Sequence, residues 1–213
     1  LLLEISEHKQ TTEALSQSYK NLQRTLLQAV EALVSTLEKR DRYTADHQKR
    51  VTQIADGIAK EIHLSAGQID GLHVAGLLHD IGKIYIPAEI LAKPSRLTEP
   101  EFSLIKIHPQ IGQEILEPIE FPWPIALTVL QHHERINGSG YPLGLRGEEI
   151  LLEAKILGVA DVVEAMVSHR PYRPARGVEK ALEEITKNKG ILYDPDVVDA
   201  CIALFTKKGF KFE

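Results

Sequence analysis

Residues 63–83 read HLSAGQIDGLHVAGLLHDIGK, and this stretch decides the fold class. Ser65 is a residue type that favours the N-cap of a helix, and Gly82 is a type that favours its end. Between them apolar residues recur at the spacing of one helical face, and His79 lies in line with that face. The sequence therefore predicts a helix that runs to Gly82 and turns a histidine, followed by Asp80, toward the protein interior.

Short helical patterns broken by glycine and proline continue through the rest of the chain after Asp41. Thr98 and Glu101 have the spacing of a capping box, with a proline in the first turn of the helix. No stretch shows the bounded alternation of apolar and polar residues that is typical of strands. We therefore expect an all-α protein: a bundle of about seven or eight helices over residues 40–213, preceded by a long coiled-coil-like helix over residues 1–39.

The N-terminal segment, residues 1–39, contains no glycine or proline. Apolar residues repeat every three or four positions, with His8 and Thr12 as polar interruptions, which predicts a long helix with one apolar seam. This pattern is equally compatible with a parallel homodimeric coiled coil and with a helix that packs on its own domain. The seam residues are Leu1, Ile5, Leu15, Tyr19, Leu22, Leu26, Ala29 and Leu33.

Composition narrows the class of protein. The 213 residues are 43% hydrophobic and 26% charged, with a net charge of −5, so no general attraction to nucleic acid polymers or anionic membranes is expected. The single cysteine, Cys201, excludes an internal disulfide and suits a reducing, cytoplasmic location. No apolar run reaches the ~20 residues of a membrane span, and no signal peptide is visible. The chain opens on Leu1, and we expect it to be a piece of a longer protein.

Several histidines and aspartates lie on the apolar faces of their predicted helices. A single inward histidine is most often a core residue bonded to a carbonyl group, whereas an unpaired inward carboxylate costs several kcal/mol. We see no lysine or arginine on the helical face of Asp80 or Asp161. The inward set consists of His47, His79, Asp80, His108, His132, His133 and Asp161.

Metal cations would relieve this concentration of buried imidazole and carboxylate groups. These donors suit iron, manganese or zinc rather than a metal selected by thiolates. If Asp80 is shared between two ions, seven side chains give each ion four protein ligands and leave positions for solvent or substrate. The other histidines, His8, His63, His73 and His169, are interpreted as structural or exposed.

Five segments of the chain resemble the HD-GYP family in their order and spacing. They are YTADHQKRV, HDIGKIYIP, the pair HP at 108–109, HHERINGSGYP and ADVVEAMVSHRPYR. The resemblance covers about residues 40–205. It implies an HD-domain helical bundle and a metal-dependent phosphodiesterase that degrades the second messenger cyclic di-GMP.

The resemblance also implies a role for each matching position. The metal ligands of the family fall on the seven inward residues, with Asp80 as the catalytic residue shared between ions. Lys83 matches a catalytic lysine that meets the substrate phosphate. Further contacts with the substrate are implied for Asp41, Gly140, Tyr141, Pro142, Arg170 and Arg173.

Two positions depart from the pattern of the family. Asn137 stands where the glycine loop usually has aspartate, a mild change at a turn position that accepts either residue. Tyr43 stands where members with three metal ions carry a glutamate ligand, and a phenol with a pKa near ~10 is a poor replacement. We therefore expect two divalent ions, iron or manganese, rather than three.

The beginning of the chain carries a second resemblance. LLLEISEHKQTTEAL is similar to the closing strand and exit of a PAS sensor domain, with the end of that domain at residues 1–12. This similarity implies a division into a signalling and dimerisation helix, 1–39, and an HD-GYP domain, 40–213. It also implies a sensor domain upstream, which the helix would connect to the enzyme.

Three classes of function follow from these observations. The first is hydrolysis of a phosphodiester bond in cyclic di-GMP, giving linear pGpG, GMP or both. The second is a phosphohydrolase for another nucleotide, such as cyclic GMP–AMP, and the third is a catalytically silent regulatory module. The complete ligand set favours the first class. In the family the Gly-Tyr-Pro loop is also associated with contacts to diguanylate cyclase domains, so such a domain is an expected partner.

Overall fold

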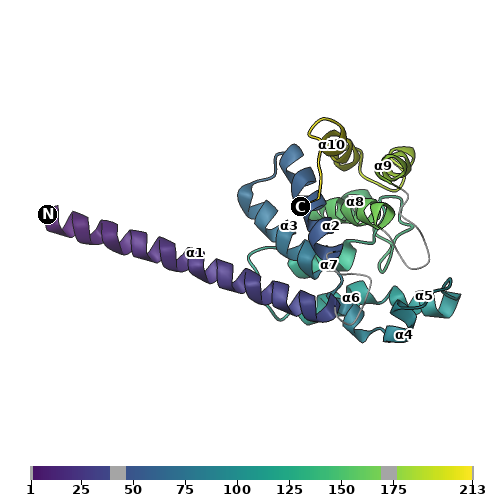
Figure 1. The fold of residues 1–213 in the computed structure, drawn as a ribbon, viewed down its shortest axis with the longest axis horizontal. Coiled ribbons are helices and arrows are strands. Elements are labelled where there is room, and N and C mark those ends of the chain that lie inside the picture. Colours follow the sequence, from purple (N-terminus) through teal and green to yellow (C-terminus); the bar gives the residue numbers. More distant parts are fainter. Residues whose placement is uncertain (1, 39–46, 169–176, 213) are drawn as a thin grey trace.

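The computed structural model describes residues 2–38, 47–168 and 177–212, and over these ranges the protein is all-α, as the sequence predicted (Figure 1). The same ranges contain two isolated β-bridges and no extended strand. The elements are α1 (Leu2–Glu38), α2 (His47–Glu61), α3 (Ala66–Leu78), η1 (Ile81–Tyr85), α4 (Ala88–Leu91), α5 (Glu99–Ile105), α6 (His108–Leu116), α7 (Ile125–Gln131), η2 (Gly147–Glu149), α8 (Leu152–Val167), α9 (Val178–Lys187) and α10 (Pro195–Thr206).

The number of helices slightly exceeds the prediction. In the described part of the chain, nine α-helices and two 3-10 helices follow α1. The difference lies in short elements such as α4, a single turn of four residues. So short a helix shows no hydrophobic periodicity that a sequence could reveal.

Both predicted helix starts have the expected hydrogen bonds. The Ser65 side chain accepts a hydrogen bond from the amide of Gln68, and the Gln68 side chain accepts one from the amide of Ser65. Helix α3 therefore begins with a capping box. Thr98 and Glu101 form the same reciprocal pair at the start of α5. Local side-chain chemistry therefore sets where these helices begin.

Helix α3 ends at Leu78, four residues before the predicted end at Gly82. The Nδ1 atom of His79 donates to the carbonyl oxygen of Gly76 at 2.7 Å. In a continuing helix this carbonyl would accept the amide of Asp80, so the histidine side chain replaces the next helical hydrogen bond. The backbone of Asp80 (φ −97°, ψ 7°) leaves the helical region, and the chain continues as η1.

Helix α2 is the central element of the bundle and packs on α3, α8 and α10. Its inward face, formed by Val51, Ile54 and Ile58, is fully buried and in line with His47, which was predicted to point inward. This face belongs to an apolar cluster shared with α8, α9 and α10. A second cluster joins the base of α1 to α3, α6 and α7. Helix α3 contributes to both clusters and so connects the two halves of the core.

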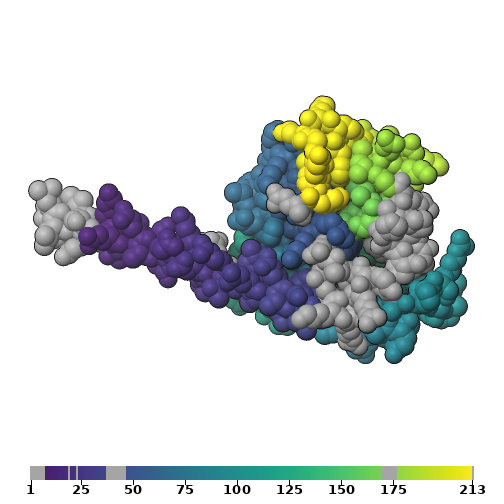
Figure 2. All heavy atoms as spheres, in the orientation of Figure 1, coloured from purple at the N-terminus to yellow at the C-terminus, as the bar shows by residue number. Residues whose placement is uncertain are grey.

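Helix α1 packs on the bundle through a face that differs from the predicted seam. Val30 and Val34 are buried in the cluster with α3, and Leu27 lies partly buried beside them. Most of the helix stands clear of the bundle, as Figure 2 shows. The four seam leucines whose side chains the structure describes are exposed: Leu15, Leu22, Leu26 and Leu33. The base of α1 therefore packs on its own domain, while the described part of the seam faces solvent. The side chains of Leu1, Ile5 and Tyr19 lie outside the described set.

The first turns of α1 are helical, whereas the resemblance to the end of a PAS domain implied a closing strand. Residues 2–12 belong to the same continuous helix as the rest of α1, not to a strand. A helix with the length and sequence of α1 continues without interruption because no glycine or proline breaks it. The link to an upstream sensor domain stays a prediction. None of the described helices combines the length and the apolarity needed to cross a membrane.

Candidate metal centre

All seven predicted ligands converge, although they come from five parts of the fold. They lie close to helix ends or on an inward helix face, where the backbone is held by the two apolar clusters. His47 is the first residue of α2, His79 and Asp80 follow α3, His108 is the first residue of α6, His132 and His133 follow α7, and Asp161 lies within α8. The structure therefore brings together the whole inward set, which was predicted only from the helix face on which each residue lies.

Three of the histidines bond a backbone carbonyl three residues earlier, at the end of a helix. A carbonyl can only accept a hydrogen bond, so each Nδ1 carries a hydrogen and each Nε2 keeps its lone pair. Metal-binding histidines in proteins are oriented in the same way by a bond at the other ring nitrogen. The pairs are His79 with Gly76 (2.7 Å), His108 with Ile105 (2.8 Å) and His132 with Val129 (2.6 Å).

His47 is oriented by a carboxylate instead. Its Nδ1 donates to Glu164 Oε2 at 2.5 Å, while its Nε2 lies 3.4 Å from Asp161 Oδ1. Burial alone would raise the pKa of Glu164, but hydrogen bonds from His47, Ser168 and Arg50 outweigh it and lower the pKa to about 2. Sequence analysis missed Glu164. Its position three residues after Asp161 on an inward helix face was the available signal, but the partner on α2 was not visible.

One buried atom indicates that the cluster suits a cation. Nε2 of His79 is buried without a hydrogen-bond partner among the described residues. Because Nδ1 carries the hydrogen, this atom presents a lone pair, and an unpartnered buried lone pair is costly unless a donor or a metal ion meets it. Imidazole nitrogens and carboxylate oxygens are also the ligand types of divalent transition metals. The donor set therefore fits a divalent cation.

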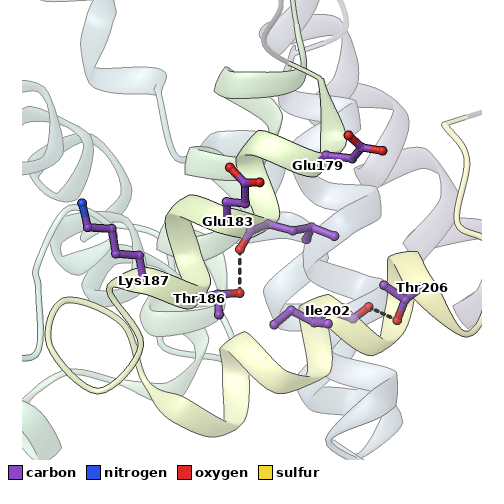
Figure 3. A pocket seen from close by; sticks show the side chains of 7 residues that line it. Glu179, Glu183, Thr186, Lys187, Ile202 and Thr206 are labelled. Atoms are coloured by element: carbon purple, nitrogen blue, oxygen red, sulfur yellow. Dashed lines mark hydrogen bonds between the residues drawn. The ribbon is translucent and has the colours of Figure 1, made fainter.

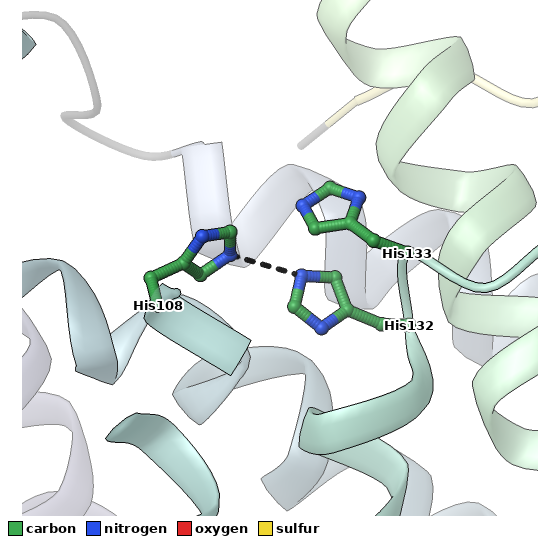
Figure 4. Close-up of side chains that lie close together, drawn as sticks. All are labelled: His108, His132 and His133. Atoms are coloured by element: carbon green, nitrogen blue, oxygen red, sulfur yellow. Dashed lines mark hydrogen bonds between the residues drawn. The ribbon is translucent and has the colours of Figure 1, made fainter. Parts of the chain in front are cut away.

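The ligand atoms form two groups that share one aspartate. His47, His79 and Asp80 offer one group, and His108, His132 and His133 offer the other (Figure 4). Within the second group, Nε2 of His108 lies 3.4 Å from Nε2 of His132.

The carboxylate of Asp80 faces both groups. Its Oδ1 lies 3.4 Å from Nε2 of His108. Its Oδ2 lies 3.5 Å from Nε2 of His79 and 3.9 Å from Nε2 of His47. With Asp161 beside His47, each group gains four potential ligands when Asp80 is counted in both. Asp80 therefore lies between the two groups of histidines.

The prediction that no cationic side chain shares the face of Asp80 was wrong. Lys83 Nζ donates to Asp80 Oδ2 at 2.5 Å. The chain after Asp80 is the 3-10 helix η1, in which residues three apart lie directly above one another. The side chain of Lys83 is partly exposed, so this lysine stands between the buried aspartate and solvent.

Burial keeps three of the histidines neutral. It is the main cause that lowers the pKa of His108 to about 4. It also lowers the pKa values of His132 and His133 well below the ordinary value, and the neighbouring imidazoles add to the effect. Neutral imidazole is the form that binds metal ions.

For the two aspartates and for His47, neighbouring groups outweigh the effect of burial on the pKa. Burial would raise the pKa of Asp80, but Lys83 and the nearby histidines hold it well below its usual range; hydrogen bonding and charge from His47 do the same for Asp161. Burial would lower the pKa of His47, but Asp161 and Glu164 raise it to about 9. Both aspartates are therefore ionised at neutral pH, and a cation that binds His47 replaces a proton.

The Gly-Tyr-Pro loop lies against this cluster. The ring of Tyr141 packs on the ring of His133 with centroids 4.7 Å apart, and burial raises the pKa of its hydroxyl group. The Tyr141–Pro142 peptide bond is cis. A Cβ at Gly140 would lie 2.4 Å from the Cα of Glu134, so only glycine permits this approach of the loop.

A buried glutamate that sequence analysis also missed holds the far side of the loop. The carboxylate of Glu134 accepts hydrogen bonds from the amides of Leu143, Gly144 and Leu145 at 2.7–3.1 Å. Asn137 accepts from the amide and hydroxyl groups of Ser139, bonds that an aspartate oxygen would also make. The remaining predicted positions, Asp41, Tyr43, His169, Arg170 and Arg173, lie outside the described residues.

A groove elsewhere on the surface is separate from the cluster. It lies between α9 and α10 (Figure 3), and its threonine hydroxyls bond carbonyls of their own helices. Its lining contains none of the predicted ligands: Glu179, Leu182, Glu183, Thr186, Lys187, Ile202 and Thr206. This groove is therefore distinct from the candidate metal site.

Comparisons with known proteins agree with this fold. The model of the HD domain family matches residues 21–197. The cyclic di-GMP phosphodiesterase response regulator RpfG of Xanthomonas campestris pv. campestris is 39% identical over 207 residues, covering 91% of this chain and 55% of that protein. The 3′3′-cGAMP-specific phosphodiesterase 3 of Vibrio cholerae is 35% identical over 178 residues, covering 84% and 38%. The HD domain of the L. monocytogenes phosphodiesterase PgpH shares the fold, with a TM-score of 0.59 at 23% identity over 85% of this chain and 99% of that one.

The chain belongs to the HD domain family and, by its five motifs, to the HD-GYP proteins within it. The chain spans about half the length of the first curated relatives that it matches.

Gly82 provides a test of how the cluster is held together. A Cβ at this position would lie 1.9 Å from the carbonyl oxygen of His108, so η1 and α6 touch through bare backbone. We expect Gly82→Ala to lower the free energy of unfolding of the metal-free protein by about 1–3 kcal/mol. Gly67→Ala is the matched control: its Cβ would meet only Trp123 at 3.8 Å on an exposed turn of α3, and it should stabilise by about 0.5–1 kcal/mol. Urea unfolding of both variants with equal stabilities would contradict this account.

Proposed function

We propose that this domain hydrolyses a phosphodiester bond of cyclic di-GMP, giving linear pGpG, GMP or both. The observation that carries the proposal is the bridging position of Asp80, whose two oxygens face two separate groups of histidines. Hydrolysis of phosphodiesters by pairs of cations uses such an arrangement. The name of the Xanthomonas relative supports cyclic di-GMP as the substrate.

The proposed cofactor is a pair of divalent ions, iron or manganese. The ligands would be His47, His79, Asp80 and Asp161 for one ion and Asp80, His108, His132 and His133 for the other. The lack of thiolates and the mixture of nitrogen and oxygen donors favour these metals. Tyr43, in place of a glutamate, argues against a third ion.

When bound, divalent ions polarise phosphoryl oxygens and lower the pKa of water. Lys83 stands at the rim of the cluster, where its ammonium group would neutralise charge on the phosphate. Tyr141 presents an aromatic ring for a nucleobase, and Gly140 and Pro142 shape that loop. Asp41, Arg170 and Arg173 are proposed as further substrate contacts, with the arginines offering bidentate bonds to phosphate or guanine.

Cyclic GMP–AMP is the second candidate substrate. The Vibrio cholerae relative named as specific for 3′3′-cGAMP favours it. A purine ring stacked on Tyr141 would not distinguish guanine from adenine, since every base offers a π-face. A catalytically silent module is disfavoured, because all seven ligand types are retained.

The remaining proposals concern the setting of the domain. The exposed seam of α1 supports a homodimer through this helix. An upstream PAS-like sensor, a cytoplasmic location and contact of the Gly-Tyr-Pro loop with a diguanylate cyclase domain complete the proposed picture of a signalling enzyme.

The proposed activity is tested with protein loaded with Mn²⁺ or with Fe²⁺ under anaerobic conditions. We expect metal analysis to give two ions per chain. We also expect conversion of cyclic di-GMP, measured by chromatographic separation of the products, with cyclic GMP–AMP assayed in parallel. Asp80→Ala should lose metal content and reduce turnover to background, because both groups lose a ligand. Asp70→Ala, an exposed aspartate on α3, should leave both unchanged. Three tightly held ions, or full metal content in Asp80→Ala, would overturn the bridging assignment.

His133 and Tyr141 touch one another, yet their loss should act differently. His133→Ala removes a proposed ligand, so metal content and kcat should fall together. Tyr141→Ala removes a stacking contact worth about 1–3 kcal/mol, which corresponds to a rise in KM of about 5- to 150-fold with metal content unchanged. Tyr141→Phe keeps the ring and should resemble the wild type. If Tyr141→Ala leaves the kinetics intact but abolishes capture of a diguanylate cyclase domain, the loop serves interaction and not substrate binding.

The homodimer can be tested without disturbing the core. Leu15→Glu with Leu22→Glu places charges in the exposed seam, and we expect light scattering to show monomers in place of dimers. Truncation of the whole helix is less suitable, because it also removes the buried Val30 and Val34. Gln10→Glu with Gln17→Glu adds the same charge away from the seam and should leave the dimer intact. A monomeric wild type would refute the proposal.

A further inference from the structure

Glu164 lies behind the metal centre rather than in it. Its side chain is 1% exposed, and its Oε2 accepts from Nδ1 of His47 at 2.5 Å. On the opposite edge of the same ring, Nε2 faces Asp161 and Asp80 at 3.4 and 3.9 Å. Asp161 and Glu164 are one turn apart on α8, so this helix contacts both nitrogen atoms of the imidazole.

The second oxygen of Glu164 is also engaged. Oε1 accepts from Arg50 Nε at 2.7 Å and from Ser168 Oγ at 2.5 Å. Arg50 follows His47 by one turn of α2, and Ser168 is the C-cap of α8. With donors on both oxygens, the carboxylate cannot rotate, and it fixes the ring of His47 relative to α8.

The position of His47 in its helix explains why a carboxylate is needed. His79, His108 and His132 find acceptors for Nδ1 in carbonyl groups at helix ends. His108 also opens a helix, but it follows the end of α5 directly, and the Ile105 carbonyl at that end accepts its Nδ1. His47 opens α2, where the first turn presents free amides and not free carbonyls, and the preceding helix α1 ends well before it, at Glu38. The acceptor for Nδ1 of His47 comes from another element, Glu164 of α8.

We propose that Glu164 is a positioning residue of the metal centre: it holds His47 as the tautomer with hydrogen on Nδ1, so that Nε2 is the atom that binds the cation. This inference rests on the proposed metal site. Carboxylates that bond the outer nitrogen of a ligand histidine typically change metal affinity by 10- to 100-fold.

Glu164→Gln is a sharp probe because it keeps the shape and changes only the pattern of donors. Arg50 is always a donor, so it draws the amide oxygen of the glutamine to its own side. The NH₂ group then points at Nδ1 of His47, which must become an acceptor. The hydrogen moves to Nε2, and this nitrogen loses the lone pair that a cation requires.

The experiment titrates Zn²⁺ against a competing chelator into metal-free wild type, Glu164→Gln, Arg50→Met and the double variant, with folding checked by circular dichroism. We expect Glu164→Gln to lower the affinity for one of two zinc ions by about 10- to 100-fold. Arg50→Met should lower it by less than about 5-fold. In the double variant the amide is free to turn its oxygen to His47. The double variant should therefore bind zinc at least about twofold more tightly than Glu164→Gln.

Each outcome has one meaning. Wild-type zinc affinity in Glu164→Gln would overturn the positioning role. So would a loss of zinc affinity in the double variant that exceeds the combined losses of the two single variants. The recovery in the double variant cannot come from a purely structural role, because a second lost contact would add to the damage. If the wild type itself binds no divalent ion, the proposed metal site fails instead, and the two failures are thereby distinguished.

Discussion

The hydrogen bond from a histidine Nδ1 to the carbonyl three residues earlier is the interaction on which the centre depends. A helix end leaves carbonyl groups without partners. In this fold three such ends, those of α3, α5 and α7, each give a carbonyl to a histidine. One bond thus closes the helix, selects the tautomer and points Nε2 at a common centre. At His47, which does not directly follow the end of another helix in the described part of the chain, a glutamate takes over the same task.

Electrostatics and packing act together around that centre. Burial keeps His108, His132 and His133 neutral, while Lys83 and the histidines keep Asp80 ionised. At neutral pH these histidines and Asp80 therefore have the protonation states that metal ligands need. His47 is different, because it must release a proton before it can bind a cation. The nearby apolar clusters hold the helices that carry these groups, so the geometry is set by the same residues that stabilise the bundle.

Much of this arrangement could be predicted from the sequence, because it follows from local rules. Helical periodicity indicated an all-α fold, capping residues located the starts of α3 and α5, and facing identified all seven convergent side chains. What could not be predicted depends on contacts between distant segments. Glu164 acquires its role from a residue 117 positions away, and Gly82 from backbone contact with His108. The ion pair of Lys83 with Asp80 was missed because Lys83 lies beyond the predicted helix end at Gly82, whereas the chain continues as a 3-10 helix to Tyr85.

The packing of α1 has a mechanical consequence. Val30 and Val34, near the base of this helix, share one apolar cluster with Leu77 and Leu78, the last residues of α3 before His79 and Asp80. Close-packed interiors transmit displacement instead of absorbing it. A tilt or rotation of α1 therefore acts as a lever with its short arm beside the carboxylate of Asp80. The far end of the 37-residue helix, at 1.5 Å per residue, gives that lever a long arm of roughly 40–50 Å.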